Sequence, residues 1–203
     1  MKIGPRYKIG KRLGASVFEK CQTQKFMLSE ARSKKRRSSR RPRQLSDFGK
    51  QLLEKQKVRY TYGITEKQLS KYVKEATQSP SESKNRVYQG LESRLDNIVY
   101  RFGIVHTRRF ARQVVSHGHI MVNGRRVTIP SYKIGIKDVI SVRENSKDKG
   151  LFIDLEERLK NNTVPKWLIF DSKKLEGKMS SLPDFGVADI SLDFDLVLES
   201  YSR

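Results

Sequence analysis

The dipeptide Asn123-Gly124 constrains the fold of this chain more than any other short stretch. It separates two segments, 120–122 and 127–129, in which apolar residues alternate with other residues. Asn-Gly accommodates the positive φ angles that a type I′ turn needs at both central positions, so the pattern predicts a β-hairpin. Residues 138–143 alternate in the same way and predict a further strand.

Two short helices are expected directly before this hairpin. Ser93 and Asp96 have capping-box spacing at the start of the first helix, and its apolar residues keep a helical period until Gly103. Thr107 is expected to cap the second helix, which ends at Gly118. Three arginines of this second helix fall largely on the side opposite its apolar face: Arg108, Arg109 and Arg112.

Residues 93–132 resemble a known RNA-binding module, which is named after bacterial small-subunit ribosomal protein four. The resemblance rests on the run SRLDNIVYRFG from Ser93, on the Thr107-Arg108-Arg109 start, and on the run VSHGHIMVNGRRVTIPSY that ends at Tyr132. The same module occurs in RNA-modifying enzymes and in a class of synthetases. The module alone therefore leaves the function open.

The flanking segments resemble the ribosomal protein and not the other owners of the module. They include Gln44–Tyr60, Glu66–Leu69, Pro165–Leu168 and the terminal Leu198–Arg203. On these residues the chain is identified as a member of the ribosomal family. The resemblance implies a structural constituent of the small subunit that binds the five-prime domain of its ribosomal RNA, nucleates assembly and contributes to translational accuracy. It also implies contact with small-subunit ribosomal protein five and other ribosomal proteins.

Net charge points independently to a polyanionic partner. The chain carries a formal charge of +21 and has a pI of about 10.2. Residues 1–60 hold 19 basic against 4 acidic side chains, whereas residues 151–203 hold 7 against 10. Counterion release favours nucleic acid as the ligand of such a surface. We expect RNA to meet the first half of the chain and the module, with no membrane and no small-molecule substrate as partners.

The predicted fold class is α+β, with a basic extended N-terminal tail, a small helical domain and a central module of two helices, a β-hairpin and a short sheet. We place the tail at 1–45, the helical domain at 46–92, completed by 190–203, the module at 93–150, and a mixed extension that packs on it at 151–189. Ser46, and Thr65 with Gln68, are expected to cap two helices of the helical domain.

The predicted RNA contacts come from three regions. The module contributes Arg101, Thr107, Arg108, Arg109, Arg112, His117, His119, Asn123, Arg125, Arg126, Ser131 and Tyr132. The tail contributes Lys34, Lys35, Arg36, Arg37, Arg40, Arg41 and Arg43. The helical domain contributes Lys50, Lys55, Lys57 and Arg59. Arginine suits this role because its planar fork binds phosphate oxygens in pairs.

No cofactor, metal or catalytic residue is expected. Many members of the family carry a four-cysteine zinc site near the N-terminus, but Cys21 is the only cysteine here, and a structural zinc needs about four ligands. His117 and His119 lack partners for metal binding or general base catalysis, so an RNA contact or a structural hydrogen bond is the preferred reading. Two alternatives stay open: a free-standing RNA-binding or ribosome-recycling factor, and an RNA-modifying enzyme.

The chain lacks a secretory signal core and an apolar run of membrane-spanning length. We therefore expect it in the cytoplasm, on the ribosome, with an organellar ribosome as the alternative.

Overall fold

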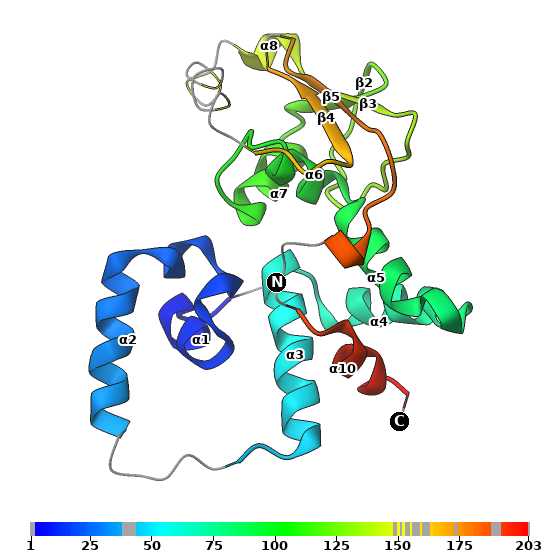
Figure 1. The fold of residues 1–203 in the computed structure, drawn as a ribbon. Helices are drawn as coiled ribbons and strands as arrows, with labels where there is room; N and C mark the ends of the chain where they lie inside the picture. The colour runs from blue at the N-terminus through cyan, green and yellow to red at the C-terminus, as the bar shows by residue number, and fades with distance from the viewer. Residues whose placement is uncertain are drawn as a thin grey trace. The chain divides into compact units, whose positions relative to one another are not determined.

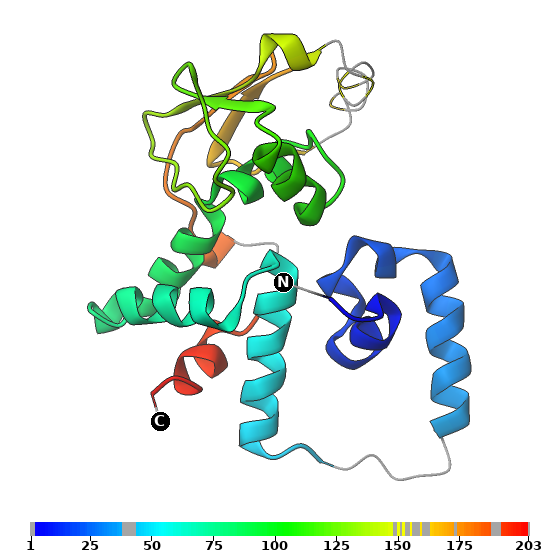
Figure 2. The ribbon, with the colours of Figure 1, turned by 180° about the vertical axis from the view of Figure 1, so that it is seen from behind.

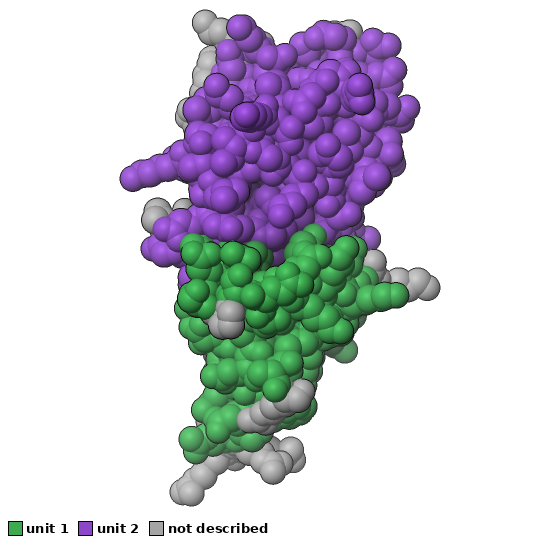
Figure 3. Space-filling model, turned by 90° about the vertical axis from the view of Figure 1, so that its right-hand side faces the viewer, with its two compact units in different colours: residues 1–87, 188–203 green, residues 88–187 purple. Residues whose placement is uncertain are grey.

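The computed structural model of the protein describes residues 3–37, 44–147, 163–172, 174–187 and 192–202, together with Gly150, Phe152, Leu155 and Leu159. The chain divides into two compact units, which Figure 3 distinguishes by colour. Unit 1 comprises residues 1–87 and 188–203, and unit 2 comprises residues 88–187. Helices and an antiparallel sheet together confirm the predicted α+β class.

The N-terminal part of unit 1 is helical where the sequence predicts an extended tail. Helix α1 (Arg6–Leu13), the 3-10 turns η1 (Ala15–Val17) and η2 (Glu19–Gln22), and helix α2 (Gln24–Arg37) follow one another. They enclose a small core of Leu13, Val17, Phe18, Cys21 and Phe26. High charge and few apolar residues indicate an open chain, but these few side chains lie close enough in sequence to bury one another.

Two longer helices of unit 1 begin at their predicted capping residues. Helix α3 (Asp47–Tyr62) starts at Ser46, whose side chain accepts a hydrogen bond from the Gly49 amide, and it ends at Gly63 with a φ of 62°. Helix α4 (Glu66–Ala76) has the complete capping box of Thr65 and Gln68. These contacts satisfy amide groups that the first turn of a helix leaves without partners.

The C-terminal helix α10 (Phe194–Glu199) packs against α3, as the two views in Figures 1 and 2 agree. Asp193 caps it by accepting from the amides of Asp195 and Leu196. Gln51 of α3 donates to Glu199 at 3.1 Å, so a hydrogen bond joins segments that are 148 residues apart.

Residues 77–86 have few apolar side chains and a turn-forming Ser79-Pro80-Ser81 run, yet the last part of this stretch is helical. After the 3-10 turn η3 (Pro80–Glu82), helix α5 runs from Ser83 to Glu92. The Ser83 hydroxyl donates to the carbonyls of Ala76 and Ser79, and Val87 and Leu91 are fully buried. Burial of these side chains outweighs the turn-forming composition of the residues before them. Helix α5 crosses the boundary between the two units.

Unit 2 contains the helices α6 (Leu95–Arg101) and α7 (Arg108–Ser116) and a five-stranded antiparallel sheet. The strands are β1 (Ile120–Val122), β2 (Arg125–Arg126), β3 (Val139–Val142), β4 (Leu168–Asp171) and β5 (Glu176–Met179), in the order β2-β1-β3-β5-β4. A one-turn helix α8 (Glu144–Lys147) follows β3, and a 3-10 turn η4 (Phe185–Val187) follows β5. The last two strands come from the predicted extension and complete the sheet of the module.

The predicted hairpin is confirmed. Asn123 and Gly124 have φ angles of 50° and 75°, and Val122 pairs with Arg125 across the turn. The Asn123 side chain accepts from the Val139 amide and donates to Asp138 at 2.7 Å. Strand β2 ends at Arg126 instead of continuing to residue 129, because the carbonyls of Pro130 and Tyr132 turn toward the start of α6 and accept from its amides.

The core of unit 2 lies between α6, α7 and one face of the sheet. Phe102 packs so closely on β5 that a Cβ at Gly177 would lie 2.5 Å from its ring. Trp167 is partly buried and packs against this core. Leu151, Leu155 and Leu159 have helical spacing after Gly150, but most of residues 151–162 lie outside the described residues. Leu155 and Leu159 are described and buried. Among the residues with described positions, no helix combines the length and apolar character needed to cross a bilayer.

Candidate nucleic-acid interface

Helix α6 begins differently from the predicted capping box. Arg94 occupies the N-cap position without a side-chain cap, and the buried hydroxyl of Ser93 has no hydrogen-bond partner among the residues that the structure describes. The prediction that Ser93 and Asp96 cap this helix is therefore wrong. The carboxylate of Asp96 instead accepts from two arginines, because positively charged guanidinium groups donate stronger hydrogen bonds to a carboxylate than the backbone amide of Ser93 would in a capping box.

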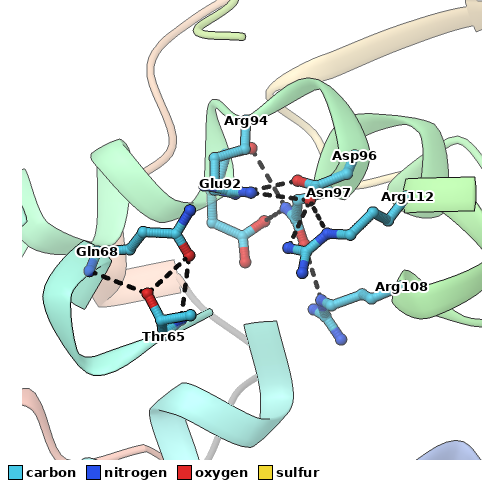
Figure 4. A network of polar contacts seen from close by, with 8 residues as sticks. All are labelled: Thr65, Gln68, Glu92, Arg94, Asp96, Asn97, Arg108 and Arg112. Carbon is cyan, nitrogen blue, oxygen red and sulfur yellow. Dashed lines mark hydrogen bonds and ion pairs between the residues drawn. The ribbon is translucent and has the colours of Figure 1, made fainter. Parts of the chain in front are cut away.

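Asp96 is the centre of the first arginine cluster, shown in Figure 4. Arg94 donates from Nε to Oδ1 at 3.0 Å and from Nη2 to Oδ2 at 2.9 Å, which is a bidentate pair. Arg112 of α7 donates from Nε and Nη2 to Oδ2, at 3.1 and 2.8 Å. One buried carboxylate therefore orients an arginine of its own segment and an arginine of the neighbouring helix.

Glu92 is the centre of the second cluster. Its fully buried carboxylate accepts from Arg101 Nε and Nη2, at 2.9 and 2.8 Å, and from Asn97 Nδ2 at 2.6 Å. The Oδ1 atom of Asn97 in turn accepts from Arg108 Nε at 2.8 Å. The Arg108 guanidinium also lies over the Tyr100 ring, 4.3 Å from its centroid. A chain of contacts thus fixes Arg108 through Asn97 to Glu92.

The two carboxylates lie among four arginines, so this part of unit 2 keeps an excess of positive charge. Arg109 of helix α7 has an exposed side chain. Helix α7 itself starts as predicted, with the Thr107 hydroxyl accepting from the Phe110 amide. Thr107 acts here as a helix cap, which holds the arginines of the first turn of α7 in place.

The hairpin carries two more exposed arginines, Arg125 and Arg126. Arg126 donates from Nη2 to the carbonyl of His117 at 3.1 Å and lies across Gly118. A Cβ at Gly118 would come within 2.0 Å of Arg126 Nε, and the φ of this glycine is +73°. Glycine at this position thus permits both the end of α7 and the close approach of the arginine.

The remaining predicted site residues of the module differ in exposure. His119 hydrogen-bonds through Nδ1 to Ser146 at 2.9 Å and packs on Phe152, so it has the structural hydrogen bond that was one of its two predicted roles. His117 is exposed. Ser131 is also exposed, and Tyr132 is 39% exposed on the loop after the hairpin. Their availability for RNA stays a prediction.

The predicted basic residues of α3 form ion pairs within unit 1. Lys50 pairs with Asp47 at 3.0 Å, and Lys57 pairs with Glu54. Lys55 and Arg59 both contact Glu66 at 3.1 Å. Their side chains support the helical packing of unit 1, and a contact with RNA would have to compete with or extend these pairs.

Glu66 also accepts a hydrogen bond from the Tyr201 hydroxyl at 2.6 Å. Burial acts to raise the pKa of Glu66, but the hydrogen bonds from Tyr201 and Lys55 and the charges of Lys55 and Arg59 outweigh it, so this pKa is lowered. Burial and the same carboxylate raise the pKa of Tyr201. At neutral pH the hydroxyl therefore stays protonated and donates to an ionised carboxylate.

The predicted contacts of the tail are described only in part. Lys34, Lys35, Arg36 and Arg37 belong to the last turns of α2, and their side chains lie outside the described part of the structure. Arg40, Arg41 and Arg43 lie wholly outside the described residues. Cys21 is buried, which raises the pKa of its thiol. Within the described ranges, no group of three or more His, Cys, Asp or Glu side chains is placed to hold a metal ion.

Sequence reasoning missed the acidic residues that organise the arginines. Glu92, Arg94 and Asn97 were not among the predicted site residues, and Asp96 was assigned a capping role. The available signal was the density of polar and charged residues at the start of a short apolar helix, where burial forces them to pair.

Comparisons with known proteins cover almost the whole chain. Residues 1–93 match the family model described as the ribosomal protein S4/S9 N-terminal domain, and residues 93–140 match the S4 domain. The chain is 42% identical to small ribosomal subunit protein uS4 of Herpetosiphon aurantiacus over 206 residues, which is 98% of each chain. It is 42% identical to the protein of the same name from a Geobacillus species over 200 residues, and 37% identical to that of Caldicellulosiruptor saccharolyticus over 204 residues, with 98% or more of each chain covered.

Proposed function

Because this chain belongs to the uS4 family of small ribosomal subunit proteins, we propose that it is a structural constituent of the small ribosomal subunit and binds its RNA. The observation that carries the proposal is similarity over 98% of the chain to proteins that bear this name. The net charge of +21 and the S4 domain at residues 93–140 agree with RNA as the ligand.

We place the main RNA contact on the arginines of α6, α7 and the hairpin. Phosphate contacts position a protein without reading base sequence, so the specificity comes from the shape of a folded RNA. The ion pairs of Glu92 and Asp96 support this mode, because they hold the arginines on a rigid scaffold instead of leaving them to reorder on binding.

The finer role is the binding of the five-prime domain of small-subunit ribosomal RNA early in assembly, with a contribution to translational accuracy. Family resemblance supports this role. Small-subunit ribosomal protein five is the proposed protein neighbour, and the excess of acidic residues over basic ones in residues 151–203 is compatible with a protein contact there. The proposed location is the ribosome in the bacterial cytoplasm.

The family is one of structural ribosomal proteins, so we assign no reaction to this chain. An RNA-modifying enzyme would need catalytic groups, and the Nδ1 atom of His119 is engaged with Ser146. A free-standing factor that uses the S4 domain would not need the ribosomal N-terminal domain, which matches residues 1–93. Both alternatives are therefore less favoured.

A sucrose-gradient profile tests the central proposal. Expressed in a bacterial host, the protein should sediment with small subunits and remain there after a high-salt wash. A factor would leave the subunit in that wash, and an enzyme would act on RNA as a purified protein. Release of the protein at high salt would contradict the proposed structural role.

Exposed arginines allow a test of the RNA face itself. Arg109→Ala and Arg125→Ala each remove a side chain that the structure leaves exposed. If each contacts a phosphate, binding to small-subunit ribosomal RNA should weaken, and the log-log salt slope should fall by about 0.7 to 0.9 per lost contact. An unchanged slope for both variants would mean that RNA docks elsewhere.

A further inference from the structure

The carboxylate of Asp96 lies among the arginines of the proposed RNA-binding surface, where a negative charge is unfavourable for binding. Asp96 is 4% exposed, and its two oxygens receive hydrogen bonds from Arg94 and Arg112. Negative charge near a phosphate backbone opposes binding. The presence of Asp96 therefore needs an explanation other than attraction to RNA.

The first explanation is internal charge neutralisation, and Arg94 already supplies it. The Arg94 side chain is 3% exposed and forms a bidentate pair with Asp96. One buried guanidinium in this geometry compensates one buried carboxylate. A second arginine is therefore not required to balance the charge.

Arg112 differs from Arg94 because it reaches the surface. Its side chain is 29% exposed, and it comes from α7, 16 residues further along the chain. The Nε and Nη2 atoms both donate to Asp96, so the carboxylate fixes the plane of the guanidinium as well as its position. Figure 4 shows Arg112 directed at Asp96 from the neighbouring helix.

We propose that Asp96 is a positioning residue for RNA recognition, which holds Arg112 in one orientation before RNA arrives. This inference rests on the proposed function, since the ligand is the phosphate backbone of folded small-subunit ribosomal RNA. An arginine that is already ordered loses less side-chain entropy on binding and accepts only phosphates in a matching place. Asp96 thereby weakens the nonspecific electrostatic attraction of the protein to RNA but improves its discrimination between RNA shapes.

Electrostatics and positioning predict opposite results for Asp96→Asn. The substitution removes a negative charge and keeps the side-chain shape, so attraction alone predicts tighter binding to every RNA. Positioning predicts weaker binding to the folded ribosomal RNA, because an amide oxygen holds a guanidinium less firmly than a carboxylate does. The sign of the change in affinity thus separates the two effects.

The experiment titrates the full-length protein with two RNAs of equal length at the same salt concentration. One is a folded transcript of the five-prime domain of small-subunit ribosomal RNA, and the other is an RNA duplex of unrelated sequence. For Asp96→Asn we expect affinity for the folded transcript to fall on the order of tenfold, while affinity for the duplex stays the same or rises. Equal losses on both RNAs would indicate a merely structural role and overturn the proposal.

Glu75→Gln is the matched control for net charge. Glu75 lies on α4, is 58% exposed and pairs only loosely with Lys71, at 3.8 Å. The variant changes the charge by the same amount as Asp96→Asn, so it should leave the ratio of the two affinities unchanged. Circular dichroism and thermal melting establish that each variant is folded.

Arg112→Lys keeps the test decisive if Asp96→Asn does not fold. Lysine retains the positive charge but has no Nε–Nη2 edge for Asp96 to fix. We expect the same loss of discrimination, and no further loss in the double variant, because both substitutions break one interaction. Wild-type discrimination in Arg112→Lys overturns the inference alone, whereas a wild-type protein that does not prefer the folded transcript overturns the proposed function.

Discussion

Two regions of the molecule use the same residue types for different ends. In unit 2, Glu92 and Asp96 are nearly inaccessible and hold the arginines of α6 and α7. In unit 1, Glu66 is 43% exposed and holds Lys55 and Arg59 in a cluster that also receives Tyr201. Burial explains the difference. Water screens the ion pairs of unit 1, whereas it is excluded from those of unit 2, so removal of one partner there costs more free energy.

Glu92→Ala should have the largest effect and tests whether the buried clusters of unit 2 are stronger than the partly exposed cluster of unit 1. The substitution removes the buried carboxylate that accepts from Arg101 and Asn97, so the free energy of unfolding should fall by about 3 to 5 kcal/mol. The matched variant Glu66→Ala should cost only about 1 to 2 kcal/mol in urea unfolding, because its ion pairs are partly solvated and the hydrogen bond from Tyr201 is the main loss. Similar losses in the two variants would mean that burial does not separate these clusters.

Arg126 differs from the arginines of α6 and α7 because a backbone carbonyl, and not a carboxylate, accepts its hydrogen bond. The variants Gly118→Ala and Gly124→Ala test whether Arg126 contributes to RNA binding. Both glycines have positive φ, so each alanine should destabilise the protein by about 1 to 2 kcal/mol in thermal unfolding. A Cβ would displace Arg126 only at Gly118, since no atom of the described residues lies within 4 Å of the Cβ position at Gly124. Weaker RNA binding should therefore accompany Gly118→Ala alone, and equal binding of the two variants would exclude Arg126 as a contact.

Tyr201→Phe measures what one hydrogen bond contributes in the more exposed cluster. Loss of the donor to Glu66 should reduce the free energy of unfolding by about 1 kcal/mol at pH 7. The lowered pKa of Glu66 means that its contribution is complete above the ordinary value of 4.5 and disappears as pH falls through the folded-state pKa. The gap between wild type and Tyr201→Phe should accordingly narrow below pH 4.5, and a gap that widens there would contradict the assignment.

The smallest effect is expected where both partners are exposed. Lys71 and Glu75 are 78% and 58% exposed on α4. Glu75→Gln should change the free energy of unfolding by less than about 0.5 kcal/mol in urea denaturation. A loss of several times that size would show that exposure is a poor guide to the strength of ion pairs in this chain.

Local features of the fold were predictable because they depend on residues a few positions apart. The caps at Ser46, Thr65 and Thr107 and the turn at Asn123-Gly124 all form between near neighbours in the chain. The helix after residue 83 was not predictable in the same way. Its start depends on the burial of Val87 and Leu91, which composition does not reveal.

The candidate site was predictable only in part. Its arginines other than Arg94 could be named from the hairpin and from the faces of the helices, whereas their acidic partners could not. Asp96 meets Arg112 across 16 residues after α6 and α7 have packed together, and Glu92 at the end of α5 meets Arg101 at the end of α6 across 9. The same holds for the last helix, where Glu66 and Tyr201 are 135 residues apart.

The amino-acid sequence by itself determined the charge, the family, the caps at Ser46, Thr65 and Thr107, and the hairpin, since each depends on composition or on residues close together in the chain. The tertiary structure decided which charged side chains are buried and therefore which ones pair. An arginine is held in one orientation only if its carboxylate partner is buried, because a low local dielectric strengthens their interaction. That low dielectric arises only when distant segments of the chain pack together.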